Sequence, residues 1–134
     1  MTAGIETLHI VGQWVAKAEE DLINARHTLT LREHCPLSTV CFHAQQMVEK
    51  YLKALLILHG RPFPKSHDLL EIFRRLQDGP MIQINPVDLG ILNRYAVEAR
   101  YPGDWEPITR EEAEEAVLLA ERVRAEVRQH LPLG

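Results

Sequence analysis

The most regular pattern in the chain lies at residues 37–59, which read LSTVCFHAQQMVEKYLKALLILH. Its apolar residues recur three and four positions apart and cover a wide arc of a helical wheel, which predicts an α-helix with neighbours on two sides. Gly60 follows as a left-handed cap, and Pro62 and Pro64 prevent the helix from continuing. We therefore expect residues 37–59 to form the central helix of the fold.

The segments on either side of this helix also have helical spacing. Upstream, one narrow apolar stripe predicts a helix from about Ile5 to Arg32. Downstream, we expect a short helix that starts at Ser66 with Asp68 in its first turn, and another from about Pro86 to Arg100. The last helix opens with Thr109-x-x-Glu112, a capping-box pattern.

The predicted fold class is all-α, an up-and-down bundle of about five helices in a single domain over residues 1–134. The segment MIQIN at residues 81–85 is the one candidate strand, and we expect it to be a loop. A chain of 134 residues fits one globular unit, which excludes an enzyme with separate cofactor and substrate lobes.

Charge and cysteine content exclude several other classes of protein. Fifteen Lys and Arg residues against nineteen Asp and Glu residues give a net charge of −4, which excludes a generally basic nucleic-acid binder. Cys35 and Cys41 cannot build a disulfide framework, and no C-x-x-C spacing occurs. We find no signal-peptide pattern and no apolar run of membrane-spanning length. We therefore expect a cytoplasmic protein with no membrane partner.

The central helix carries the most informative polar residues. His43, Gln46, Lys50 and Lys53 recur at i, i+3, i+7 and i+10, so they form one polar ridge. One interpretation is a solvent-facing stripe in which Glu49 and Lys53 form an ordinary i,i+4 pair. The other is the wall of a cleft, where lysines bind phosphate and an amide or imidazole hydrogen-bonds a base.

Two further clusters hold residue types that bind nucleotides. The first surrounds the break after the fourth predicted helix and contains Arg94, Tyr95, Glu98, Arg100 and Tyr101. The second follows the central helix and contains His59, Arg61, Lys65 and His67. Tyrosine can stack on a base and arginine can hold phosphate, but these residues also serve as packing groups and helix-end caps. Without an H-E-x-x-H motif or paired cysteines, we expect neither a metal nor a cofactor.

Three segments carry a resemblance to a known family. They are CFHAQQMVEKYLKALLILHGRPFPKSHDLLEIFRRL at residues 41–76, NRYAVEARYPG at 93–103 and TREEAEEAVLLAERV at 109–123. Together they resemble the HEPN family (higher eukaryotes and prokaryotes nucleotide-binding domain). The resemblance implies a helical bundle that forms a homodimer and often acts with a minimal nucleotidyltransferase encoded beside it. It also implies a toxin–antitoxin connection, because many members are toxins, either RNases or targets of such a nucleotidyltransferase.

Our leading hypothesis from the sequence is a non-hydrolytic nucleotide-binding module that works with a nucleotidyltransferase. The ligand is a nucleotide or RNA, and the predicted binding residues are His43, Gln46, Lys50, Lys53, Tyr95, Arg100 and Tyr101.

Two alternatives remain open. The first is a metal-independent HEPN ribonuclease, whose family motif is an Arg followed after four to six residues by His. Arg100 lies where that Arg is expected, but Tyr-Pro-Gly-Asp-Trp-Glu follows it. Arg61 and His67 have five residues between them and are the catalytic candidates of this alternative. The second alternative is a purely structural dimeric interaction domain.

Overall fold

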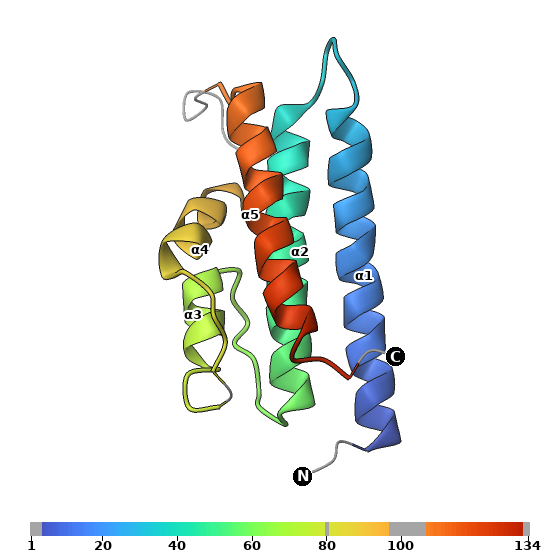
Figure 1. The fold of residues 1–134 in the computed structure, drawn as a ribbon, viewed down its shortest axis with the longest axis vertical. Coiled ribbons are helices and arrows are strands. Elements are labelled where there is room, and N and C mark those ends of the chain that lie inside the picture. The colour runs from blue at the N-terminus through green and yellow to red at the C-terminus, as the bar shows by residue number, and fades with distance from the viewer. Residues whose placement is uncertain (1–3, 80, 97–106, 133–134) are drawn as a thin grey trace.

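The computed structural model describes residues 4–79, 81–96 and 107–132. Three long helices dominate it: α1 (Ile5–Leu29), α2 (Leu37–Leu58) and α5 (Arg110–Arg128). The short elements are α3 (Leu69–Arg74), α4 (Pro86–Leu92) and the 3-10 helix η1 (Asn93–Tyr95). Figure 1 shows α1 and α5 beside α2, with α3 and α4 on the side away from α1. The described residues contain no strand, which confirms the all-α bundle.

Local signals in the sequence set several of these boundaries. Gly60 has a φ of +66° and lies just beyond α2, as predicted. Thr109 caps α5, because its hydroxyl accepts a hydrogen bond from the backbone N–H of Glu112 at 3.0 Å. Residues 81–85 form a loop. Within the described ranges, none of the helices has the apolar length that a membrane crossing requires.

Three predicted helices are shorter in the structure. α1 ends at Leu29 rather than near Arg32, because the amide and the hydroxyl of Thr30 both bond to the carbonyl of His27 and tighten the last turn. α3 starts at Leu69, since Asp68 is its N-cap rather than part of its first turn. The helix predicted from Pro86 ends at Leu92 and tightens into η1, and the part near Arg100 lies outside the described residues.

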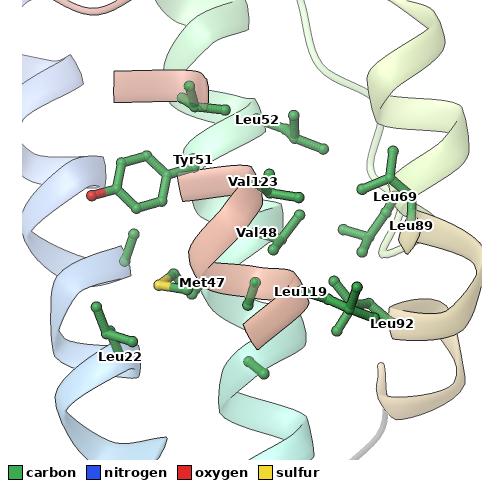
Figure 2. Packing of buried hydrophobic residues seen from close by; sticks show 14 of the residues in the cluster. Leu22, Met47, Val48, Tyr51, Leu52, Leu69, Leu89, Leu92, Leu119 and Val123 are labelled. Atoms are coloured by element: carbon green, nitrogen blue, oxygen red, sulfur yellow. The ribbon is translucent and has the colours of Figure 1, made fainter. Parts of the chain in front are cut away.

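The apolar core is built around α2, as its wide apolar arc predicts. In Figure 2, Met47, Val48, Tyr51 and Leu52 of α2 lie between Leu22 of α1 on one side and Leu69, Leu89 and Leu92 on the other. Leu119 and Val123 of α5 complete the cluster. Each large apolar side chain that is fully buried contributes about 1.5–3 kcal/mol to folding, so α2 is the main source of hydrophobic stabilisation.

A polar contact joins all three long helices at the edge of this core. Arg124 of α5 donates two hydrogen bonds to Glu19 of α1, at 2.7 and 2.8 Å. The hydroxyl of Tyr51 donates to the same carboxylate, and Arg128 donates to that hydroxyl at 3.0 Å. The hydrogen bonds from Arg124 outweigh the effect of burial and lower the pKa of Glu19 to about 2. Glu19 therefore stays ionised and fixes α1 against α2 and α5.

Replacing Glu19 with glutamine removes the carboxylate that joins these helices. We expect the free energy of unfolding at pH 7 to fall by about 1.5–3 kcal/mol, the range for hydrogen bonds to a charged group. Because folding lowers the pKa of Glu19 from 4.5 to about 2, its stabilising effect is complete above pH 4.5 and is lost as the pH falls through about 2. The difference between wild type and Glu19→Gln in urea unfolding should therefore shrink as the pH falls through this window.

Glu20→Gln is the matched control for this experiment. Its partner, Lys17, is a surface residue on the same helix, so we expect a change within about 0.5 kcal/mol at every pH. A Glu19→Gln effect that is constant between pH 5 and pH 2.5 would contradict the lowered pKa of this carboxylate.

Candidate functional site

The polar ridge predicted on α2 is divided into two hydrogen-bonded groups. The first, the Asp21 group, contains Asp21, His43 and Lys50. Asp21 of α1 is 5% exposed, and Lys50 donates to its carboxylate at 2.6 Å. Nδ1 of His43 lies 2.8 Å from the other carboxylate oxygen. The His43 and Lys50 side chains remain 22% and 25% exposed, so Asp21 holds both from behind while their outer surfaces face solvent.

The second group, the Glu49 group, contains Gln45, Glu49, Lys53 and His67. Glu49 is 3% exposed, and the Lys53 ammonium donates to it at 3.0 Å. Nδ1 of His67 lies 3.0 Å from the same carboxylate. The Gln45 amide donates to Glu49 at 3.3 Å and to the His67 carbonyl at 3.2 Å. These contacts hold the segment after α2 against the helix.

Lys53 is enclosed within this second group. Its ammonium lies 5.8 Å from the ring centre of Trp14 and 5.2 Å from that of Phe63, and the two rings meet edge to face at 5.5 Å. The predicted Glu49–Lys53 pair therefore forms, but it is buried rather than exposed to solvent. The loop that carries Phe63 folds back over α2, a tertiary contact that helical spacing cannot reveal.

The Glu49 carboxylate sets the orientation of His67. Burial alone would raise the pKa of Glu49, but hydrogen bonds from Lys53 and His67 outweigh it and the pKa is lowered. Because the ionised carboxylate accepts a hydrogen bond at Nδ1, neutral His67 carries its proton there and a lone pair on Nε2. The His67 side chain is 69% exposed, so Nε2 is available to a ligand.

Gln46 lies between the two groups on the face of α2. It is half-buried, and its amide donates to Oε1 of Gln45 at 2.8 Å. Helical spacing puts Gln46 on the side of α2 that carries His43 and Lys50. His43, Gln46 and Lys50 thus lie along one side of α2, and His67 is held next to the adjoining Gln45 and Glu49. We call these four residues the α2 polar surface.

Tyr95 belongs to a different part of the molecule. It is 4% exposed, and its hydroxyl donates to Glu112 of α5 at 2.5 Å, so burial and this carboxylate raise its pKa. Cys41 of α2 lies close enough to Tyr95 to raise its pKa electrostatically. Lys53 follows Cys41 by twelve positions on α2, which is about 18 Å along the helix. Tyr95 is therefore not brought together with Lys53. The other predicted residues of its cluster, Arg100 and Tyr101, lie outside the described residues.

Arg61 and His67, the catalytic candidates of the ribonuclease alternative, lie at opposite ends of α3. The Arg61 guanidinium donates to the carbonyl of Arg75, just beyond the end of α3, at 2.6 Å. His67 comes immediately before Asp68, the N-cap of the same helix. The short helix therefore separates the two side chains within one chain, although only five residues lie between them in sequence.

Sequence reasoning missed three residues that shape this region: Asp21, Trp14 and Phe63. A signal existed for Asp21, because Ala18, Asp21 and Ala25 share the i, i+3, i+7 spacing of a buried face. Trp14 and Phe63 carry no local signal, since they meet only when the loop after α2 packs on α1 and α2.

The sequence pattern that defines the HEPN domain matches residues 11–130. The chain belongs to the HEPN family. A protein of Methanocaldococcus jannaschii named "Putative toxin MJ1304" is 35% identical over 127 residues, in an alignment that covers 82% of this chain and 80% of that protein.

Two solved structures have the same fold. The crystal structure of TT1696 from Thermus thermophilus matches with a TM-score of 0.71 and 29% identity, over 89% of this chain and 96% of that one. The crystal structure of ST0689, described as an archaeal HEPN homologue, matches with a TM-score of 0.67 over 90% of this chain and 97% of that one. ST0689 is 22% identical, so it supports the fold alone.

Removing the Glu49 carboxylate tests the geometry of the Glu49 group. Glu49→Ala leaves the buried Lys53 ammonium without its partner, so we expect the free energy of unfolding to fall by about 3–5 kcal/mol. Adding Lys53→Met to this variant removes the uncompensated charge and should recover a large part of the loss. Urea denaturation followed by circular dichroism measures both effects.

The neighbouring Gln46→Ala is the control for this pair of variants. Gln46 is half-buried and donates one neutral hydrogen bond, so its removal should cost about 0.5–1.5 kcal/mol. An equally small loss in Glu49→Ala would show that Lys53 does not depend on Glu49.

Proposed function

We propose that this chain is a toxin-related HEPN module that binds a nucleotide or a nucleic-acid end without cleaving it. In this proposal it forms a homodimer and acts with a minimal nucleotidyltransferase. Family membership supports the general assignment, and the 35% identity to the protein named "Putative toxin MJ1304" supports the toxin relation.

The α2 polar surface is the observation that carries nucleotide binding. Lys50 has three N–H donors and gives one to Asp21, so two remain for a phosphate. Gln46 gives one amide hydrogen to Gln45 and keeps another for a base or a phosphate oxygen. Because Asp21 holds His43 and Lys50 in place, little conformational entropy is lost when a ligand binds.

Lys53 and Tyr95 contribute to this proposal differently from Lys50. The Lys53 side chain is 10% exposed and Tyr95 is 4% exposed, whereas the Lys50 side chain is 25% exposed, so we assign the phosphate contact to Lys50. Arg100 and Tyr101 lie outside the described residues and remain predicted members of the site.

Thermal-shift titration with a panel of nucleotides tests this function. A nucleotide at about one hundred times its Kd stabilises the folded state by about 2.7 kcal/mol, which raises Tm measurably. Lys50→Ala should weaken binding about tenfold or more, since it removes a charge-assisted hydrogen bond. Lys17→Ala, which removes a lysine that is paired on the surface of α1, should leave the titration unchanged.

The partnership is tested by looking for a minimal nucleotidyltransferase in the adjacent reading frame and by co-expressing the two proteins. We expect such a protein to be encoded there and to co-elute with this chain in size-exclusion chromatography. If no nucleotide shifts Tm and no such complex forms, the proposed function is wrong.

The orientation of His67 favours one second candidate function, a metal-independent ribonuclease. An exposed imidazole with a carboxylate on Nδ1 has the arrangement of a general base, which takes a proton at Nε2. Arg61 lies at the other end of α3 in the same chain, so in this candidate a second subunit supplies the arginine that holds phosphate.

An RNA-cleavage assay in the presence of a metal chelator tests this second candidate. Cleavage should persist without divalent metal, and His67→Ala should reduce it about 100-fold or more, the contribution of a general base. His9→Ala, which removes an exposed imidazole on α1, is the control and should cleave normally. Intact RNA with the wild type, or normal cleavage by His67→Ala, would exclude the ribonuclease.

A further inference from the structure

The carboxylate of Asp21 brings an ammonium and an imidazole together on the α2 polar surface. Lys50 donates to one of its oxygens at 2.6 Å, and Nδ1 of His43 lies 2.8 Å from the other. Asp21 itself is 5% exposed, so it is a buried anchor for the two side chains that it holds. Lys50 and His43 therefore lie side by side at one carboxylate, and both are partly open to solvent.

The same carboxylate decides where His43 carries its proton. An ionised carboxylate can only accept hydrogen bonds, so the neutral imidazole has its hydrogen on Nδ1, facing Asp21. Nε2 then has a lone pair and no hydrogen. Protonation adds a hydrogen at Nε2 and a positive charge to the ring, and it leaves the bond to Asp21 in place. His43 is thus an acceptor at Nε2 when it is neutral and a donor there when it is charged.

A bound anion distinguishes these two forms of His43. Lys50 keeps two N–H groups and Gln46 keeps one, so an anion that binds beside them is met by donors. The lone pair of a neutral imidazole repels the oxygen atoms of such an anion, whereas the N–H group of a charged imidazole donates to them. An anion that contacts all three side chains therefore binds the protonated form of His43 more tightly.

The charges around His43 favour the same form in the complex. Asp21 faces His43 from α1, and its charge is cancelled by Lys50 of α2. Lys17, one turn before Asp21 on α1, pairs with Glu20 at 3.2 Å. The groups already in place thus leave the charge of an incoming anion unbalanced, and a proton at Nε2 supplies positive charge next to it.

A second surface with several arginines provides the comparison for this site. A groove of about 600 Å³, which we call the α1–α5 groove, lies between the second half of α1 and the first half of α5. Arg26, Arg32 and Arg110 line it, and so do the acids Glu114 and Glu121. Among the described residues that line the groove there is no histidine, so an anion bound there would not depend on the protonation of an imidazole.

We propose that the α2 polar surface holds a phosphate group of its ligand between Lys50, Gln46 and His43, and that binding is coupled to the uptake of a proton at Nε2 of His43. The proton comes from the solvent and returns to it when the ligand leaves. The coupling rests on the nucleotide binding of the proposed function, and it adds the contacts of the phosphate group and a dependence on pH.

Nucleoside 5′-sulfates are the probes that test this coupling, with adenine, guanine, cytosine and uracil as the bases. A phosphate monoester loses a proton near about pH 6, whereas a sulfate ester stays ionised and adds no pH dependence of its own. Isothermal titration calorimetry measures the Kd of each probe. Because histidine ordinarily titrates near about pH 6.5, we expect Kd to rise about tenfold or more between pH 5.5 and pH 8.5. Titrations in two buffers with different heats of ionisation should show proton uptake directly.

Two substitutions of His43 separate its two contacts. His43→Asn keeps a donor for Asp21 but has no atom at the position of Nε2. His43→Gln places an amide N–H group near that position, and this group does not titrate. Both variants should bind the probes with a Kd that changes by no more than about twofold over the same pH range, since neither takes up a proton. Circular dichroism verifies that each variant is folded.

Two further variants are the controls. His67→Asn keeps a donor for Glu49, and it should retain the pH dependence of the wild type whatever its affinity. Arg32→Ala removes a cation of the α1–α5 groove, so it should leave both the affinity and its pH dependence unchanged.

The coupling is overturned if the wild-type Kd does not change with pH, if the pH dependence persists in both His43 variants, or if it disappears in His67→Asn. Weaker binding in Arg32→Ala would assign the anion to the groove and would also overturn it. So would binding of nucleoside monophosphates without binding of any sulfate. A flat pH profile leaves the proposed function standing, because that function requires only that a nucleotide binds, whereas failure of every sulfate and every monophosphate to bind overturns both.

Discussion

The burial of one carboxylate, that of Glu49, determines how the short elements α3 and η1 are attached to α2. An ionised group that is 3% exposed requires partners, because a buried charge without them costs several kcal/mol. Lys53 comes from the same helix, but His67 comes from the segment that follows α2 and has to fold back to reach it. The next residue, Asp68, caps α3 and accepts a hydrogen bond from Asn93 of η1 at 2.8 Å. The contact between Glu49 and His67 therefore positions Asp68, and Asp68 in turn positions α3 and η1.

The same principle acts twice on α1, where two carboxylates bind polar groups of neighbouring helices. Glu19 accepts hydrogen bonds from Arg124 of α5 and Tyr51 of α2, and Asp21 accepts one from Lys50 and lies within bonding distance of His43. Apolar packing alone permits small rotations of a helix about its axis, because dispersion contacts are not directional. Short hydrogen bonds to ionised groups are directional, so they hold α1 at one rotation. The imidazole of His43 is oriented by the same contacts.

The parts of the fold that depend on local chemistry could be predicted from the sequence, and those that depend on distant contacts could not. The extent of α2, the cap at Gly60 and the Thr109 cap all follow from neighbouring residues. The burial of Lys53 depends on Phe63 and Trp14, which meet only after the chain has folded. For the same reason the polar ridge was correct as a helical face but incomplete as a description of which side chains reach solvent. The Arg61–His67 spacing shows the converse, since α3 separates two residues that are close in sequence.

Helical geometry places the α2 polar surface and the α1–α5 groove on opposite flanks of α1. Asp21 reaches α2 from one side of the buried stripe, whereas Arg26 and Thr30 line the groove from the other side. At 100° per residue, Asp21 and Arg26 point about 140° apart around the helix axis. Because hydrogen bonds to the carboxylates of Glu19 and Asp21 fix the rotation of α1, the two surfaces keep a constant orientation to each other.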